Sequence, residues 1–471
     1  MFSKYTVYCR HQAFALTRPL SLACALLVGL MLAACASVPG SANVPADADG
    51  SSAVTAPLDQ SAWWTSFGDP LLSQLVTQAL QANTSIRSAQ AALQQSRALR
   101  DVTVASAGPN LTLSGSAGRS QTEHFEAINS FKAGLDARWE MDIFGGNRAS
   151  INASEADAQA AQASLRDVQV SIAAEVALAY IDLRGYQAQL AIAQSNLTSQ
   201  QETLQITQWR AQAGLVTSLE VEQAQTSVAQ TAALVPALET SLARTRHSLS
   251  VLTGQRPLEL DGLLSPTQPV PSVAPANSDT TGQIPANTLR QRADVRAAEH
   301  RVSAALARVD AADAARYPSF NLGGSLASSA LTLAGLGNAG TLVGSLLASV
   351  SVPLFDGGAA NSQLLSQQAA LEQSRAAYQA TVLAALQEVE DALVALANDR
   401  QRLVLQQLAA NSAGNAALLA NNRYASGLID FQSVLQTQRT LLSSQDSVAS
   451  LQAALSADHV RLIKALGGGW Q

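Results

Sequence analysis

The sequence predicts a mainly α-helical protein that also contributes transmembrane β-strands to a barrel shared by several copies of the chain. Three observations lead to this fold class. One segment alternates apolar and polar residues over the length of a long strand. A second, very long segment contains no proline, and most of the chain consists of two copies of one internal repeat. Charged residues make up 14% and aromatic residues 4% of the 471 residues, so large side chains for a thick globular core are few. This composition favours long, alanine-rich helices that pack closely in a single layer, because the small alanine side chain allows close approach.

The internal repeat is visible in matched segments. Residues 139–146 match residues 351–358, and the Arg-x-x-x-Gly-Leu sequence at Arg210 returns at Arg423. The prolines between the two copies exclude a regular helix there. Together with the N-terminal pattern described below, the repeat predicts six segments: a signal peptide at 1–34, a lipidated linker at 35–70, a first repeat at 71–256, a proline-rich linker at 257–287, a second repeat at 288–466 and a C-terminal tail at 467–471.

Residues 131–144 show the clearest strand pattern. Apolar side chains from Phe131 to Ile143 alternate with polar ones, which is the period of a strand with two different faces. The run is long enough for a tilted transmembrane strand, which needs about 9–11 residues. Weaker strand patterns occupy 111–120, 319–328 and 342–355. The polar face, which we expect to line a water-filled lumen, carries Lys132, Asp136, Arg138, Glu140 and Asp142.

Four strands cannot close a transmembrane barrel, because about eight strands are the lower limit. An open sheet in lipid would also leave backbone groups at its edges without hydrogen-bond partners. The sequence therefore predicts that other copies of the chain complete the barrel.

The helical segments are unusually long. Residues 71–106 have a helical pattern, opened by Asp69 and Pro70. The 64 positions from Asn147 to Arg210 contain no proline and would span roughly 95 Å as a helix. Leucines recur every seven residues in this run, as in a coiled coil. A generic coiled coil would explain the leucines but not the attached strands. The long helices are expected at 147–210, 218–254, 358–423 and 431–466.

The N-terminus has the pattern of a secretory signal peptide. A basic stretch without acids precedes the apolar run from Leu20 to Leu32, and small residues follow. The sequence Leu-Ala-Ala before Cys35 resembles a bacterial lipobox, which implies a lipid on Cys35 after cleavage. Ala36 follows, and in bacterial lipoproteins the absence of Asp at this position implies sorting to the outer membrane. An ordinary signal peptide with a chance cysteine is the alternative. No cysteine follows Cys35, so the mature chain can form no internal disulfide.

Several function classes are disfavoured. The net charge of -6 and a pI near 5.4 argue against nucleic-acid binding. Residues 335–340 spell Gly-x-Gly-x-x-Gly, but they lack the strand, helix and distant acid of a dinucleotide site. The histidines have no metal-site spacing, and no nucleophile–base pair stands out. We therefore expect no enzyme activity and no cofactor apart from the lipid on Cys35.

Taken together, these segments resemble the outer membrane factors of Gram-negative efflux systems, of the TolC, OprM and NodT type. The resemblance covers nearly all of 61–466, with the minor departure that the family usually has proline where Ala293 stands. It implies a homotrimer with a TolC-like fold, in which twelve strands form an outer-membrane β-barrel and twelve helical lengths form a periplasmic α-barrel. The resemblance rests on residues 63–71, 79–83, 139–145, 292–299, 352–358 and 423–427.

The resemblance also implies a passive conduit that works with a periplasmic adaptor and an inner-membrane pump. The lipobox and the Trp63-Trp64 start favour small-molecule drug efflux with a resistance-nodulation-division pump over type I protein secretion. A periplasmic adaptor and a structural envelope lipoprotein are the alternatives. An adaptor would have a single helical hairpin flanked by soluble β domains, and a structural lipoprotein would have no transmembrane strands.

Two turns are the candidate functional sites. Glycine permits the positive φ angle at the end of a helix, so Gly214 and Gly427 are expected to cap hairpins. In the family these turns form the periplasmic tip where the adaptor docks, a role that maps onto Arg210, Gly214, Leu215, Arg423, Gly427 and Leu428. Gate positions map onto Tyr424, Ser433 and Gln436, and Asp430 lies near the gate but out of register with the family's acidic positions. Ser433 and Gln436 are neutral where the family often has acidic rings, so we expect closure by hydrogen bonding and packing.

Overall fold

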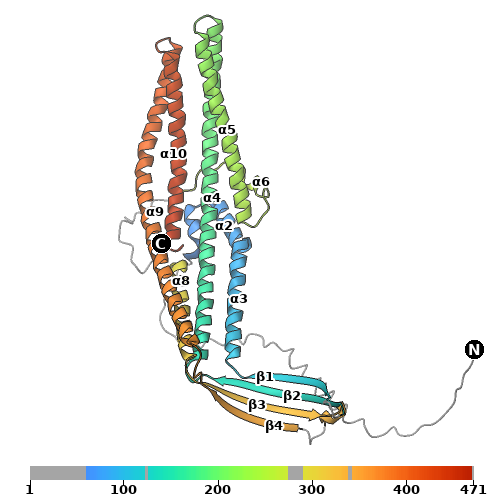
Figure 1. Ribbon diagram of the computed structural model, residues 1–471. Helices are drawn as coiled ribbons and strands as arrows, with labels where there is room; N and C mark the ends of the chain where they lie inside the picture. Colours follow the sequence, from blue (N-terminus) through green and yellow to red (C-terminus); the bar gives the residue numbers. More distant parts are fainter. Residues whose placement is uncertain (1–59, 122–125, 274–289, 338–341, 469–471) are drawn as a thin grey trace, which may run out of the picture. The chain divides into compact units, whose positions relative to one another are not determined.

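The structure is a computed structural model that describes residues 60–121, 126–273, 290–337 and 342–468. Cys35 and the signal peptide lie outside these residues. The chain forms two pairs of long helices and one sheet, which can be followed in Figure 1. In chain order the elements are η2 (Gln60–Phe67), α2 (Pro70–Ala82), α3 (Thr84–Ser106), β1 (Asn110–Ser120), β2 (Ile128–Met141), α4 (Gly146–Gln212), α5 (Ser218–Leu252), α6 (Asp261–Leu264), α8 (Ala293–Ala314), β3 (Ser319–Ala330), η3 (Leu333–Gly337), β4 (Leu342–Ser351), α9 (Ala359–Ala425) and α10 (Phe431–Ala465).

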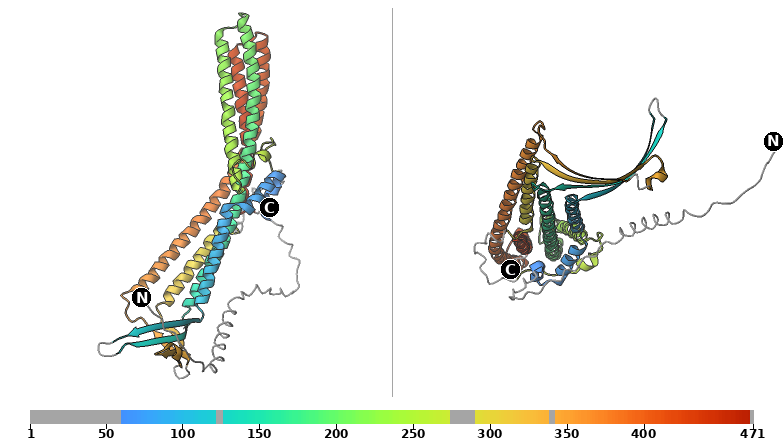
Figure 2. Two further views of the ribbon diagram at one scale, coloured as in Figure 1. Left: turned by 90° about the vertical axis from the view of Figure 1, so that its right-hand side faces the viewer. Right: turned by 90° about the horizontal axis from the view of Figure 1, so that it is seen from below.

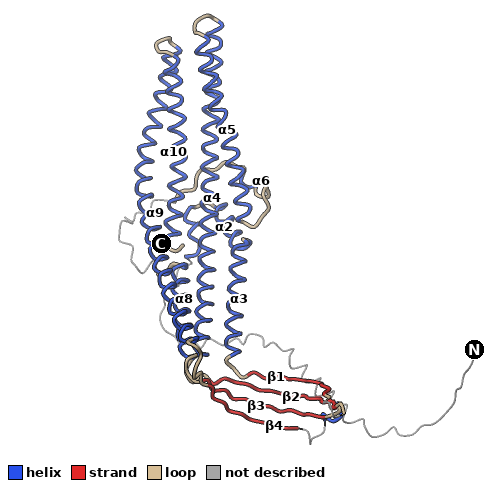
Figure 3. The backbone as a smooth tube through the Cα atoms, in the orientation of Figure 1, coloured by secondary structure: helices blue, strands red, loops and turns tan. Residues whose placement is uncertain are grey.

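The two halves of the chain repeat the same order of elements. Helices lead into a pair of strands, which are followed by a long helix, a tight turn and a returning helix (Figure 3). The long helices α4 and α9 both have 67 residues, and the returning helices α5 and α10 both have 35 residues. Equal lengths in both copies place the two turns at the same end of the helices.

The four strands form one antiparallel sheet in the order β1-β2-β3-β4. Strands β2 and β3, from different repeats, are neighbours, with Leu135 opposite Leu326 and Asp136 opposite Ser325. Side chains of β1 and β4 are exposed throughout. Among the described residues, β1 and β4 each have a strand neighbour on one side only. The sheet therefore has two open edges and a largely exposed apolar face, of which η3 covers only the end near Ser328 and Ala330.

The main hydrophobic core surrounds the middle of α4. Trp63, Phe67 and the buried leucines of α2 pack there against Val176 and Tyr180 of α4. Helix α10 approaches α4 closely on another side. A Cβ atom at Gly185 would lie only 2.9 Å from the Cβ of Ala453. Glycine at this position allows the close approach of the two helices.

A buried arginine connects this core to the proline-rich linker. Arg184 has no exposed surface, and its Nη1 atom donates to the carbonyl oxygen of Pro266 at 2.7 Å. Its Nη2 atom lies 3.0 Å from the hydroxyl of Tyr180. The linker is not wholly irregular, since α6 forms one helical turn and buries Leu264. This turn departs from the prediction that the linker contains no regular helix.

Three element boundaries differ from the sequence-based expectation for physical reasons. The helix expected at 71–106 is broken at Asn83, whose side chain caps α3 through the backbone N–H groups of Ser85 and Ile86. Strand β2 ends at Met141, because Asp142 caps α4 instead of continuing the strand. Strand β4 ends at Ser351, two residues before Pro353, since proline cannot donate to a ladder.

No helix among the described residues has both the length and the apolar character needed to cross a bilayer.

Candidate functional site at the hairpin tips

Each helical hairpin turns through a glycine in the left-handed region. Gly214 has a φ of 73° and Gly427 a φ of 72°. The N–H of Leu215 donates to the carbonyl of Arg210 at 2.8 Å, and the equivalent bond in the second hairpin is 2.9 Å. These are the bonds of a Schellman motif, which satisfies carbonyls at the end of a helix. A Cβ atom would meet nothing within 4 Å at either glycine, so backbone conformation alone requires glycine here.

The turns present apolar side chains to solvent. Leu215 and Leu428 follow the two glycines, and each is 73% exposed. Trp209, one residue before Arg210, is 59% exposed. Sequence analysis missed Trp209, although a tryptophan beside a turn in a chain with few aromatics is a usable signal. The two tips therefore offer an apolar surface suited to contact with another protein.

Arg210 links the first hairpin to the second. Its Nη2 atom donates to the carbonyl of Ala425 at 2.9 Å, and its Nη1 atom donates to the carbonyl of Tyr424 at 3.2 Å. These carbonyls belong to the last turn of α9, where a helix leaves carbonyl groups unpaired. The guanidinium carbon also lies 4.7 Å from the centre of the Tyr424 ring, at cation–π distance. Arg210 therefore holds the end of α9 against α4.

Tyr424 makes a second link between the hairpins. Its ring is buried against Phe431, with ring centres 5.3 Å apart, and its hydroxyl donates to Oε2 of Glu220 at 3.1 Å. Burial raises the pKa of the Tyr424 hydroxyl above its ordinary value. Sequence analysis missed Glu220. The available signal was its position 213 residues before Ser433, where the repeat aligns the two hairpins.

The other gate positions show no ring of carboxylates among the residues that the structure describes. Asp430 is the cap of α10, and its Oδ1 atom accepts hydrogen bonds from the N–H of Ser433 at 2.9 Å and from its hydroxyl at 2.5 Å. These two bonds hold the pKa of the Asp430 carboxyl below its ordinary value. Gln436 is exposed. Asp430 therefore acts in helix capping, and Ser433 is its partner.

Arg423 does not join this cluster. Its side chain is exposed, and its guanidinium donates no hydrogen bond to any of the residues that the structure describes. The repeat makes it the counterpart of Arg210, yet only Arg210 finds acceptors within the described part of one copy of the chain.

The charged residues of β2 lie as the alternation predicts, with one exception. Lys132, Asp136, Arg138 and Glu140 alternate along the strand and share one face. Asp136 lies 3.3 Å from the hydroxyl of Ser114 on β1. The exception is Asp142, whose carboxylate accepts from the backbone N–H groups of α4 and from the Arg148 side chain.

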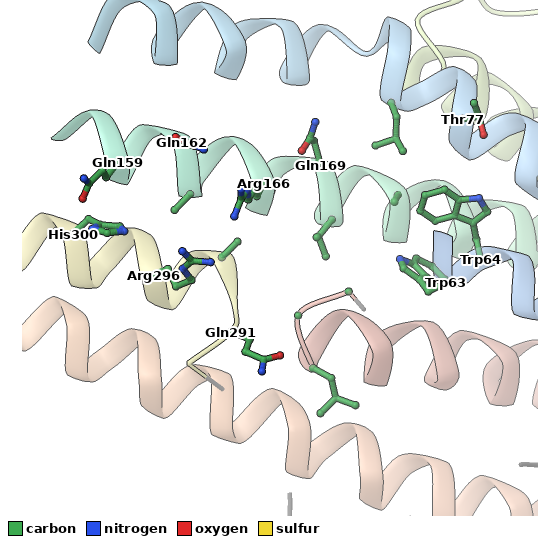
Figure 4. A pocket seen from close by; sticks show the side chains of 18 residues that line it. Trp63, Trp64, Thr77, Gln159, Gln162, Arg166, Gln169, Gln291, Arg296 and His300 are labelled. Carbon is green, nitrogen blue, oxygen red and sulfur yellow. The ribbon is translucent and has the colours of Figure 1, made fainter. Parts of the chain in front are cut away.

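One cavity of the described chain lies away from the tips. It has a volume of about 830 Å³ and lies between α4, α8 and the segment that carries Trp63 and Trp64. Figure 4 shows Arg166, Arg296 and His300 at its wall. Among the predicted site residues that the structure describes, none lines this cavity.

Comparison with known proteins agrees with this architecture. A sequence profile of the family described as outer membrane efflux protein matches residues 75–255 and 284–468. Nodulation protein T of Rhizobium leguminosarum bv. viciae is 31% identical over 418 residues, which cover 87% of this chain and 84% of that protein. Toluene efflux pump outer membrane protein TtgI of Pseudomonas putida is 31% identical over 415 residues, which cover 86% of both chains.

Solved structures share the fold. The outer-membrane channel OprN superposes with a TM-score of 0.81 at 36% identity, covering 88% of this chain and 94% of that chain. The outer membrane protein VceC of Vibrio cholerae gives a TM-score of 0.80 at 27% identity, covering 87% and 99%. These similarities confirm the predicted TolC-like channel fold. From its sequence and from its structure, this chain belongs to the outer membrane efflux protein family.

Proposed function

We propose that this chain is the outer-membrane channel of a tripartite efflux system, a non-catalytic conduit built from three copies of the chain. The observation that carries the proposal is the four-stranded sheet with two open edges and one largely exposed apolar face. A structural envelope lipoprotein would have no such sheet. A periplasmic adaptor would have one helical hairpin, whereas this chain has two.

The sheet supports a shared barrel. Large apolar side chains on one face of the strands are strongly exposed, among them Leu113 at 76% and Leu346 at 79%. Lipid would cover this face, and pairing of β1 with β4 of the next copy would remove both open edges. Twelve strands from three copies fall within the range of known outer-membrane barrels. The opposite face, with Lys132, Asp136, Arg138 and Glu140, would then line the water-filled lumen.

The tips support a gate and a docking surface. Arg210 and the Tyr424–Glu220 hydrogen bond draw the two hairpins together, which narrows the periplasmic end of the conduit. Leu215 and Leu428 remain exposed for a periplasmic adaptor. The adaptor would connect the channel to an inner-membrane pump of the resistance-nodulation-division type, which supplies the energy and selects small-molecule substrates.

Lipidation would fix the mature chain to the outer membrane. The lipobox at Cys35 supports cleavage before this cysteine and attachment of acyl chains. Two or more chains give stable anchoring, while a single chain binds reversibly. Apart from this covalent lipid, the proposal includes no cofactor.

The test uses a Gram-negative strain that lacks its own efflux channels but retains a resistance-nodulation-division pump and adaptor. Expression of this chain should lower the intracellular accumulation of a fluorescent dye, and Cys35→Ala should reduce the amount of channel retained in outer-membrane fractions. A variant with Gly214→Pro and Gly427→Pro serves as the inactive control, because proline cannot adopt positive φ. Unchanged dye accumulation with abundant outer-membrane protein, tested with several adaptor–pump pairs, would contradict the proposed conduit.

A further inference from the structure

Helix α8 packs along the first half of α4, and this junction joins the two repeats of the chain. Figure 2 shows the two helices running side by side. At two points an arginine of α8 has a partner on α4. Arg301 donates to the hydroxyl of Ser164 at 3.0 Å, and Arg308 forms an ion pair with Asp157. At these points the junction supplies each cation of α8 with an acceptor on α4.

The cavity beside this junction is different, because cations line it from both helices. Arg166 of α4 and Arg296 of α8 are on opposite walls, and in Figure 4 both side chains extend into the space between the helices. Neither guanidinium has a hydrogen bond or an ion pair with a residue that the structure describes. Among the described residues that line the cavity, none is Asp or Glu. Two facing cations repel each other, and a bound anion would remove that repulsion.

The cavity has two ends of different character. It follows α4 from Gln159 to Ala173, which is roughly 21 Å of helix at 1.5 Å per residue. Figure 4 shows the two arginines toward one end and Trp63 and Trp64 at the other. These tryptophans belong to the main hydrophobic core, so their end of the cavity is apolar. The volume of about 830 Å³ lies in the range of small-molecule sites, in which a few polar groups fix the orientation of a ligand on apolar walls.

We propose that this cavity binds an anionic amphiphile, with its carboxylate or phosphate between Arg166 and Arg296 and its apolar chain against Trp63 and Trp64. Guanidinium groups bind both kinds of head group through paired N–H donors, and indole rings offer large apolar surfaces. The ligand bridges α4 and α8 and so holds the two repeats together. Every described lining residue belongs to one copy of the chain, so the inference does not rest on the proposed trimer.

The test measures ligand binding to the purified mature protein in phosphatidylcholine nanodiscs by quenching of tryptophan fluorescence. The probe is dodecanoate with a bromine at the end of its chain, because bromine quenches an indole only at close contact. A parent protein with Trp139→Phe, Trp209→Phe and Trp470→Phe keeps only Trp63 and Trp64. The brominated acid should quench their fluorescence. The equivalent brominated alcohol lacks the charge and should bind about tenfold more weakly.

Two double variants of this parent separate the charge of the cavity from the charge of the chain. Arg166→Gln with Arg296→Gln should raise the Kd of the brominated acid about tenfold and leave the Kd of the alcohol unchanged. Arg244→Gln with Arg439→Gln is the matched control, because it removes two exposed arginines of α5 and α10. This control should keep both Kd values of the parent.

A second measurement needs no change of tryptophan. At about a hundred times its Kd, dodecanoate should raise the midpoint of thermal unfolding of the wild-type protein by roughly 2–4 °C. The midpoint of the variant with Arg166→Gln and Arg296→Gln should not move. Unbrominated dodecanoate and dodecyl phosphate should each displace the brominated acid, and the one that does so at the lower concentration carries the preferred head group.

Three results would overturn the inference: equal quenching by the acid and the alcohol, equal Kd values for the two double variants, or failure of both competitors to displace the probe. The proposed function is tested separately. Monomers that bind the acid through the two arginines would contradict the channel and leave this inference intact. A threefold channel that binds the acid and the alcohol equally would do the reverse.

Discussion

The hydroxyl of Tyr180 donates a hydrogen bond to Oδ2 of Asp69 at 2.7 Å. This bond joins the middle of α4 to the cap of α2, where the other carboxylate oxygen of Asp69 accepts from the N–H groups of Leu71 and Leu72. Arg184 completes the network from the other side of the Tyr180 hydroxyl. Burial raises the pKa of Tyr180 to about 12, so the hydroxyl stays protonated over the working range of pH.

Tyr180→Phe should destabilise the protein measurably. The change leaves the Asp69 oxygen and the Arg184 Nη2 atom without this partner, and an unsatisfied buried polar group costs about 1–3 kcal/mol. The midpoint of thermal unfolding should fall by several degrees. Tyr378→Phe is the matched control, because the hydroxyl of Tyr378 on α9 makes no hydrogen bond to the described residues. Equal midpoints for both variants would show that the Tyr180 network contributes nothing.

The Tyr424–Glu220 hydrogen bond should hold the tip closed. Tyr424→Phe and Glu220→Ala should each raise the open probability of the channel by roughly tenfold, since about 1.4 kcal/mol of lost interaction changes an equilibrium by that factor. The double variant should open no further than the single ones, because both remove the same bond. Glu222→Ala, which removes an exposed acid two residues further along α5, should have no effect. Fully additive effects would refute a direct interaction.

A side chain at either turn glycine should destabilise the turn. Gly214→Ala forces alanine into positive φ, at a cost of about 1–2 kcal/mol, although no atom blocks the Cβ. Gly414→Ala is the contrasting change, because Gly414 lies inside α9 with only an ordinary contact to Leu441. It should stabilise the helix by about 0.5–1 kcal/mol. Hydrogen exchange of the tip amides should increase for Gly214→Ala and not for Gly414→Ala.

The cap of α10 should weaken in acid. The pKa of Asp430 is lower in the folded protein than its ordinary value of 3.8. Its contribution to stability is therefore present above the ordinary pKa and is lost as the pH falls through the folded pKa. Hydrogen exchange near Ser433 should rise below about pH 4 once corrected for the intrinsic rate. Asp430→Asn keeps a capping side chain that does not titrate, and it should show no such step.

The two faces of β2 should respond oppositely to a charge. Leu135→Arg places a charge on the apolar face, where an arginine at the membrane midplane costs about 2–4 kcal/mol, and it should reduce assembly in the outer membrane. Asp136→Arg changes the polar face only and should leave assembly intact while shifting ion selectivity toward anions. Heat-modifiable mobility on gels and reversal potentials provide the measurements. Equal assembly of both variants would argue against a membrane-facing Leu135.

Much of the fold is encoded in local patterns, and the sequence therefore predicts it. The alternation in β2 follows from strand geometry, and the glycine in each turn follows from the need for positive φ. The break at Asn83 has a local cap signal, but the apolar periodicity continues through it and hides the break. Asp142 fits the alternation by chance, and its capping of α4 becomes visible only when the strand end is known.

The contacts across the tip could not be predicted in the same way. Arg210 and Ala425 are 215 residues apart in sequence, and Tyr424 and Glu220 are 204 apart. No local pattern determines which side chains of one hairpin reach the other. The repeat identifies Glu220 as the counterpart of Ser433, but the two residues differ in charge and in length. The alignment of the repeats therefore points to Glu220 as a contact of Tyr424 only once the structure shows that Tyr424 reaches the first hairpin.

Electron microscopy of the mature protein, extracted with detergent from outer-membrane fractions, tests the central claim most directly. A threefold particle in which four strands per copy close a single barrel, with a long hollow helical stalk, is the predicted result. Monomers, or particles whose strands form no closed barrel, would contradict the proposal that three copies of this chain form one channel.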